Sequence, residues 1–212
     1  MADPDLIAIP TDEDGVRGFL HEPRQSLGRG MVLTHGAGSN CSSPLLVKLA
    51  EAFRGAGVSV LRCDLPFRQG RRVGPPSPKG GELDRAGLKA AVFLLRGRVT
   101  GGVILAGHSY GGRQASMLAA DEPELAERLL LLSYPLHPPR KPDQVRVQHF
   151  PRLRTPALFV HGTADPFGSI AELKEAIGAI PAHSRLIAVE GAGHDLGAKR
   201  FDSGEALAAL LS

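Results

Sequence analysis

The chain has 212 residues, of which 42% are hydrophobic, and it carries a formal net charge of +3. That length and apolar content suffice for a sizeable core, and we expect one domain over residues 1–212. The sequence has no apolar stretch long enough to span a membrane, no secretory leader and no basic block, so we expect a cytoplasmic protein with neither a membrane nor a nucleic-acid partner.

Short apolar runs alternate with amphipathic stretches along the chain. The first two runs, at residues 6–9 and 16–20, flank an acidic turn that contains glycine, which predicts an antiparallel edge hairpin. Six further runs predict parallel strands buried on both faces, at residues 30–35, 58–63, 103–108, 129–134, 157–161 and 185–189. The alternation predicts an α/β fold with a mostly parallel central sheet and helices on both faces.

Helix start signals lie between these strands. Ser43 can cap a helix whose first position is Pro44. Ser169 and Glu172 have the spacing of a capping box in front of an apolar stripe. A last helix begins near Ser203.

Two segments interrupt the alternation, residues 65–82 and residues 135–156. Both are rich in proline, so we expect long loops there. The first follows the second parallel strand. Loops at the carboxyl ends of parallel strands surround the ligand crevice, so this segment is expected to form one wall of a site; a solvated surface loop is the alternative. The second segment is too short for a helical cap domain.

The sequence GHSYG at residues 107–111 matches the pattern G-x-S-x-G of a nucleophile elbow. An apolar run precedes it and a helical pattern follows it, which is the strand-turn-helix context that the motif requires. The pentapeptide alone is a moderate signal, because a glycine-rich turn can contain a serine by chance. In this context it predicts Ser109 as a catalytic nucleophile.

A serine hydroxyl is a weak nucleophile and needs a base to take its proton. Of eight histidines, we select His194, because it lies in a glycine-rich loop just after the last predicted strand. His35 and His161 end strands and are expected to be buried structural residues. The side chain of His108 is expected to point away from the nucleophile.

The base needs a carboxylate on its other ring nitrogen. Asp165 directly follows the strand at 157–161, and the order Ser109, Asp165, His194 is the order of serine, acid and histidine on α/β-hydrolase folds. Asp195 and Glu190 are rivals by proximity in sequence, but neither follows a strand of its own. We expect a cap or surface role for Asp195 and a turn role for Asp64.

Acyl chemistry also needs hydrogen-bond donors for the developing oxyanion. We assign this role to the backbone N–H groups of Ala37, in the turn HGAG, and of Tyr110, the residue after the nucleophile. A phosphate-binding loop is excluded because the P-loop lysine is missing, and no dinucleotide fingerprint opens a helix.

The motifs HGAG, GHSYGG, HGTADPFG and GAGH, in this order, resemble the α/β-hydrolase superfamily across nearly the whole chain. The resemblance is to small capless members near dienelactone hydrolase. The stretches LRCDLPFRQGRRVGPPSP and GHSYGGRQAS are more narrowly similar to a bacterial group related to the Tex-type hydrolase-like proteins of animals. The elbow carries serine where dienelactone hydrolase has cysteine, so lactone specificity does not transfer.

These features predict a serine hydrolase, either a carboxylesterase or a thioesterase for small or short-chain acyl substrates, that works through an acyl-enzyme. It needs no organic cofactor, and no histidine, cysteine and carboxylate cluster has metal-ligand spacing. The alternative is a non-catalytic scaffold or binding protein that keeps the fold, as the animal relatives suggest. The sequence leaves the oligomeric state open.

Three arginines are candidate substrate-binding residues, namely Arg68, Arg72 and Arg113. A guanidinium fork can hold a carboxylate or phosphate of the substrate. The alternative is that they are solvated surface residues. The two cysteines, Cys41 and Cys63, are expected to be reduced thiols.

Overall fold

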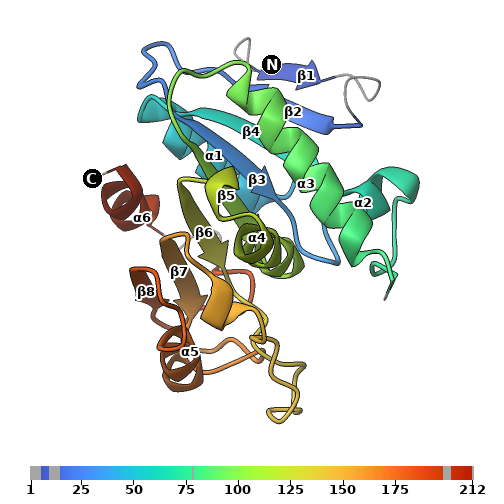
Figure 1. Ribbon diagram of the computed structural model, residues 1–212, viewed down its shortest axis with the longest axis vertical. Helices are drawn as coiled ribbons and strands as arrows, with labels where there is room; N and C mark the ends of the chain where they lie inside the picture. The colour runs from blue at the N-terminus through green and yellow to red at the C-terminus, as the bar shows by residue number, and fades with distance from the viewer. Residues whose placement is uncertain (1–5, 10–14, 78, 198–201, 212) are drawn as a thin grey trace.

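The computed structural model describes residues 6–9, 15–77, 79–197 and 202–211. Eight strands form one sheet in the order β1-β2-β4-β3-β5-β6-β7-β8 (Figure 1). The strands are β1 (Leu6–Ile9), β2 (Arg17–His21), β3 (Gly30–Thr34), β4 (Ser59–Asp64), β5 (Val103–His108), β6 (Arg128–Leu132), β7 (Ala157–Gly162) and β8 (Ser184–Val189). The helices are α1 (Pro44–Gly55), α2 (Pro66–Gly70), α3 (Gly81–Arg96), α4 (Tyr110–Asp121), α5 (Ile170–Ile177) and α6 (Ser203–Leu211).

The sheet is parallel except at its first edge. Strand β1 pairs antiparallel with β2, and β2 pairs antiparallel with β4, whereas β4, β3, β5, β6, β7 and β8 run parallel. This confirms the predicted edge hairpin; residues 10–14 of its turn lie outside the described residues. Because the parallel strands end at one edge, the turns that follow β3, β5, β7 and β8 can meet there.

Burial follows the position of each strand in the sheet. Strands β3, β4 and β7 are buried at every residue, as their continuous apolar runs predict. The prediction of burial on both faces is wrong for β8, where only Ile187 is buried. Strand β8 is the outer strand, so it has a neighbour on one side only.

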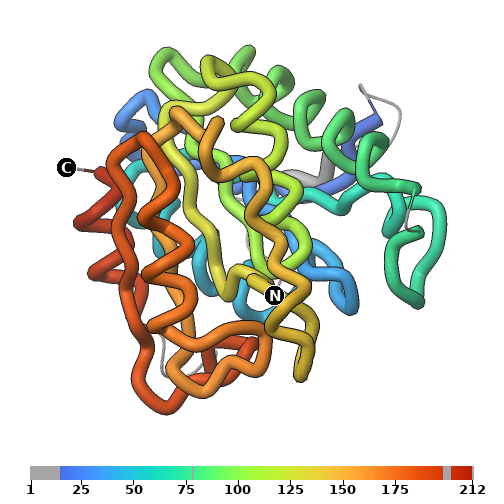
Figure 2. Tube along the Cα trace, turned by 60° about the horizontal axis from the view of Figure 1, so that its bottom comes forward, coloured from blue at the N-terminus to red at the C-terminus, as the bar shows by residue number. Residues whose placement is uncertain are grey.

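Successive side chains of the inner strands enter two different core layers. Val32, Leu61 and Leu105 pack in one layer with residues of α3, α4 and α5, while Met31 and Ile104 pack in the other with residues of α1 and α6. Both views accordingly place α3 and α6 on opposite sides of the sheet (Figure 1, Figure 2). Helices therefore cover both faces, as predicted.

The helix starts match the sequence signals in part. Pro44 begins α1, but the side chain of Ser43 makes no capping hydrogen bond. Ser169 and Glu172 form the complete capping box of α5. No helix within the described residues is long and apolar enough to cross a membrane.

The two predicted loops contain short helices. Residues 65–82 include α2, which begins at Pro66, so the prediction of irregular structure throughout is wrong there. Proline is favourable at a first helical position, which explains the turn of helix. Residues 135–156 contain only the 3₁₀ turn Phe150–Arg152, and no cap domain covers the end of the sheet there.

Candidate active site

Ser109 occupies a sharp turn between β5 and α4. Its φ of 51° and ψ of −117° lie in a region that residues with a side chain rarely adopt. A Cβ on Gly107 would lie 2.5 Å from the carbonyl carbon of Gly111, and one on Gly111 would lie 2.5 Å from the carbonyl oxygen of His35. The two glycines therefore allow the close approach of strand and helix that holds the serine in this strained conformation.

Three predicted residues form one hydrogen-bonded chain. His194 Nε2 lies 2.7 Å from Ser109 Oγ, and His194 Nδ1 lies 2.8 Å from Asp165 Oδ2. The Asp165 side chain is fully buried, whereas that of His194 is 24% exposed. The rival Asp195 accepts a hydrogen bond from the Gly197 amide, 2.9 Å away, in a local turn. This geometry leaves Asp165 as the carboxylate on the imidazole.

The surroundings of Asp165 keep it ionised. Burial raises its pKa, but the hydrogen bonds from His194 and from the Phe167 amide outweigh burial, so the pKa lies below its ordinary value. The Phe167 ring also lies against the His194 imidazole, with a centroid distance of 4.2 Å. The hydrogen bond to Asp165 and the contact with the Phe167 ring restrict the orientation of the imidazole.

His108 has a role that sequence reasoning missed. Its Nε2 lies 2.8 Å from the backbone oxygen of His194, and the two imidazole rings lie 5.2 Å apart. Burial lowers the pKa of His108 to about 4, so the ring is neutral and donates this bond. His108 thus attaches the loop of His194 to the end of β5. The only sequence signal is its place directly before Ser109.

His35 is buried, as predicted, and it orients the turn after β3. The Leu65 amide lies 3.1 Å from its Nε2, so Nε2 accepts and Nδ1–H donates to the carbonyl oxygen of Gly36, 2.9 Å away. Burial lowers the pKa of His35, outweighing the hydrogen bond to Gly36, and this keeps the ring in that single-donor form. Because N–H and C=O of a trans peptide point in opposite directions, the amide of Ala37 is turned away from His35.

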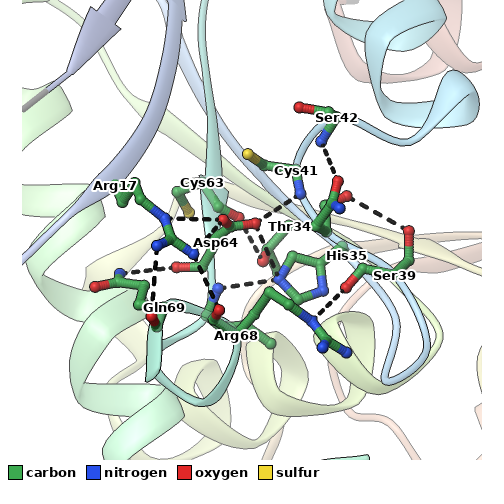
Figure 3. Close-up of polar contacts among 12 residues, drawn as sticks. Arg17, Thr34, His35, Ser39, Cys41, Ser42, Cys63, Asp64, Arg68 and Gln69 are labelled. Atoms are coloured by element: carbon green, nitrogen blue, oxygen red, sulfur yellow. Dashed lines mark hydrogen bonds and ion pairs between the residues drawn. The ribbon is translucent and has the colours of Figure 1, made fainter. Parts of the chain in front are cut away.

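Arg68 does not have the predicted position in the crevice. It is 4% exposed, and its guanidinium donates to the backbone oxygen of Ser39, 2.8 Å away (Figure 3). It also donates to the backbone oxygens of Ala37, 2.8 Å away, and of Gly74, 3.0 Å away. A side chain whose donors are occupied by backbone oxygens cannot also hold a substrate anion. Arg68 instead joins the turn after β3 to the segment after α2.

Asp64 is also more than the turn residue that we expected. It ends β4, is 8% exposed, and pairs with Arg17 at 2.8 Å while its other oxygen accepts from the Cys41 amide at 2.8 Å (Figure 3). The guanidinium of Arg62 donates to the Cys41 carbonyl oxygen. Charged side chains of β2 and β4 therefore fix the far end of the same turn.

A cavity of about 780 Å³ opens beside Ser109. Ala37 and Tyr110, the two predicted oxyanion donors, line it together with the nucleophile. Pro75, Pro76, Ser77 and Lys79 line it as well, so the segment 65–82 forms a wall, as predicted. Of the three candidate arginines only Arg113 lines the cavity; Arg72 is exposed and lies outside it.

Other reactive groups are not arranged as a second site. Cys41 and Cys63 are buried and not joined to each other, and burial raises the pKa of Cys41 to about 12. Such a thiol is protonated near neutral pH and a poor nucleophile. Among the described residues, no three histidine, cysteine or acidic side chains could hold a metal ion together.

Comparison with known proteins identifies relatives of the chain. Residues 28–212 match a family model described as an alpha/beta hydrolase domain. Rat (Rattus norvegicus) ABHD14B, provisionally named a protein-lysine deacylase, is 29% identical over an alignment of 194 residues, and the match covers 84% of this chain and 84% of that protein.

Solved structures with this fold cover nearly the whole chain. An alpha-beta serine hydrolase homologue from Coxiella burnetii has a TM-score of 0.76 at 18% identity, covering 100% of this chain and 99% of that one. Dienelactone hydrolase from Anabaena variabilis has a TM-score of 0.74 at 24% identity, covering 97% and 94%. A serine hydrolase without a lid from Xanthomonas campestris has a TM-score of 0.70 at 18% identity, covering 92% and 88%. These similarities confirm the predicted α/β-hydrolase fold and its resemblance to capless, dienelactone-hydrolase-like members.

The buried histidines generate a prediction on stability. Burial lowers the pKa of His108 and His149 from 6.5 to about 4. Between these values the unfolded chain binds protons that the folded chain does not, so the free energy of unfolding falls as the pH drops from about 6.5 to about 4. Urea unfolding across this range measures the slope. His149→Gln should flatten it by at most about 1.4 kcal/mol per pH unit. A midpoint that does not change with pH in this window contradicts the prediction.

Proposed function

The chain belongs to the alpha/beta hydrolase family, and from that premise we propose that it is a serine carboxylesterase or thioesterase for small or short-chain acyl substrates. The observation that carries the proposal is the hydrogen-bonded chain from Asp165 through His194 to Ser109, which ends at the cavity. A cytoplasmic location and a single domain over residues 1–212 are further parts of the proposal.

In the first step Ser109 Oγ attacks the acyl carbon, and His194 Nε2 takes the hydroxyl proton. Asp165 accepts the Nδ1–H of the imidazole, which leaves the lone pair on Nε2 facing the serine. As the tetrahedral intermediate collapses, the C–O or C–S bond of the substrate breaks and His194 returns the proton to the leaving alcohol or thiol.

The oxyanion of this intermediate is stabilised by the N–H groups of Ala37 and Tyr110. Tyr110 is the first residue of α4, where the backbone N–H has no acceptor within the helix. The hydrogen bond from His35 to the carbonyl oxygen of Gly36 supports this role, because it turns the Ala37 amide away from His35, and Ala37 lines the cavity.

In the second step His194 activates a water molecule, which attacks the acyl-enzyme. The acid leaves, and the proton returns to Ser109. No step draws on a metal or an organic cofactor, because the nucleophile, the base and the oxyanion donors all come from the chain.

The first test removes the nucleophile. Ser109→Ala should lower ester hydrolysis by about 10³-fold or more while the thermal midpoint stays close to that of the wild type. A fluorophosphonate probe should label the wild-type protein and not this variant. Ser184→Ala, at the amino end of β8, is a matched control and should behave as wild type. A folded wild-type protein that neither reacts with the probe nor hydrolyses esters would favour the scaffold alternative.

The second test concerns Arg68 as a positioning residue. Arg68→Met removes the donors that hold the oxygens of Ala37 and Ser39, so the oxyanion turn should lose its geometry. We expect kcat to fall by about tenfold or more while KM changes little, because the oxyanion forms only in the transition state.

Arg68→Lys is the conservative control. A lysine is a point donor that cannot reproduce the planar fork, so it should recover only part of kcat. If Arg68→Met raises KM and leaves kcat unchanged, Arg68 contacts the substrate instead.

The third test concerns acyl length. The segment 135–156 forms no cap, so a long acyl chain would extend from the cavity into water. Each buried methylene contributes only about 0.8 kcal/mol, and methylenes outside the cavity contribute nothing. Across acetyl, butyryl, octanoyl and palmitoyl esters, kcat/KM should therefore stop rising once the chain extends past the cavity, so palmitoyl should bring no gain over the shorter chains. A steep rise toward palmitoyl would disprove this prediction.

A further inference from the structure

The wall of the cavity carries an excess of positive charge. Its cationic side chains are Lys79, Arg85, Arg113 and Arg146, and among the described residues Glu82 is the only carboxylate that lines it. They come from separate elements: the segment before α3, α3 and α4 themselves, and the loop after β6. A cavity lined in this way favours an anionic ligand.

Arg113 is the cation nearest to the nucleophile along the chain. It lies in the first turn of α4, where its amide donates to the Ser109 carbonyl oxygen at 3.0 Å. Its Nε is buried, and no described residue accepts a hydrogen bond from it. A buried donor without an acceptor is costly, and the side chain that carries it lines the cavity.

Arg146 lies on the same wall and is held by its backbone. Its amide donates to the Leu136 oxygen at 2.8 Å, and its carbonyl oxygen accepts from the buried Tyr134 hydroxyl at 2.8 Å. In the described part of the chain, no acidic side chain forms an ion pair with Arg113 or Arg146. Burial, together with the positive charge of Arg113, lowers the pKa of Arg146.

Arg85 provides a contrast within the same cavity. Its Nη1 donates to the side-chain oxygen of the buried Gln114 at 3.0 Å. Arg68, outside the cavity, is occupied by backbone oxygens. Arg113 and Arg146 differ from Arg85 in that no described residue accepts a hydrogen bond from their guanidinium groups, and both are half-buried on the cavity wall.

We propose that Arg113 and Arg146 together bind a carboxylate at the far end of the acyl group, so that the preferred substrates are esters or thioesters of short dicarboxylic acids. This inference rests on the proposed hydrolase function and names its substrate class. A carboxylate between two guanidinium groups accepts charge-assisted hydrogen bonds from both and relieves their mutual repulsion. Arg113 follows Ser109 by about one helical turn, and both residues line the cavity together with Arg146, so we place the carboxylate in the cavity that receives the acyl group.

The test compares two nearly isosteric esters. p-Nitrophenyl hydrogen adipate carries a carboxylate at the end of its acyl chain, and its methyl ester lacks the charge. In the wild-type protein, kcat/KM should be about tenfold or more higher for the anionic ester. The advantage should shrink with added salt, because both arginines are partly exposed.

The variants assign the preference to the two arginines. Arg113→Gln and Arg146→Gln should each bring the ratio of the two esters toward one, mainly through KM, while hydrolysis of the neutral ester continues. Arg98→Gln removes one exposed charge after α3 and should leave the ratio unchanged. If Arg113→Gln does not fold, Arg146→Gln carries the test alone. An equal rate for both esters in the wild type overturns the inference.

Two further measurements separate this inference from the proposed function. Calorimetric titration with adipate should show binding to the wild type that is lost in Arg113→Gln, whether or not any ester is hydrolysed. Failure to hydrolyse the neutral ester refutes the proposed function, whereas failure to bind adipate refutes the anion site. A preference for 4-acetoxybenzoate over its methyl ester, with no preference among the adipates, places the anion on the leaving group and also overturns the inference.

Discussion

The site depends on the orientation of the backbone in one short turn. Because the peptide bond is planar, a hydrogen bond to a carbonyl oxygen also fixes the direction of the N–H in the same peptide. In the turn after β3, the oxygens of Gly36, Ala37 and Ser39 are all bound from behind, by the His35 imidazole and the Arg68 guanidinium. Each bound oxygen orients the amide that shares its peptide plane. Arg68 also reaches Gly74, so the turn and the wall of the cavity share one anchor. The Gly36 oxygen shares its plane with the amide of Ala37, the proposed oxyanion donor, and a donor oriented before the substrate arrives needs no reorganisation during the reaction.

Arginines around the site fall into two groups that differ in whether described residues accept hydrogen bonds from their guanidinium groups. Arg17, Arg62 and Arg68 are bound to a carboxylate, an imidazole or backbone oxygens, and they support the backbone. Arg113 and Arg146 line the cavity without such partners among the described residues. Because burying an unpaired charge is costly, the second group is better explained by a ligand than by stability.

Most of the candidate site was predicted from local motifs and from the order of strands and loops along the chain. The elbow at Ser109 was predictable because its strand, turn and glycines are adjacent in the sequence. His194 and Asp165 were predictable because parallel strands end at one edge, which brings the loops after β7 and β8 together. The edge exposure of β8 was not predictable from its apolar residues, since burial depends on where a strand lies in the sheet.

The residues that sequence reasoning misplaced are those whose partners are distant along the chain. Arg68 and Arg72 lie in the same arginine-rich segment, and the sequence does not distinguish them. In the folded protein Arg68 donates to the Ser39 oxygen, whereas Arg72 is exposed. The sequence around Asp64 predicts a turn residue. Pairing of β2 with β4 places Arg17 beside it, and the two form an ion pair. No periodicity encodes such contacts, because each depends on a register that the whole sheet must establish first.

Burial of the supporting histidines has a further consequence for the site. A histidine with its ordinary pKa would change from one hydrogen-bond donor to two near neutral pH. His35 could not accept from the Leu65 amide in that state, and the turn after β3 would lose an anchor. Since burial lowers the pKa of both His35 and His108, their hydrogen bonds persist through the range in which an ordinary imidazole titrates. The fold thus gives up some stability at low pH, and in return the backbone around Ser109 and His194 keeps one hydrogen-bond pattern while the proposed base exchanges protons.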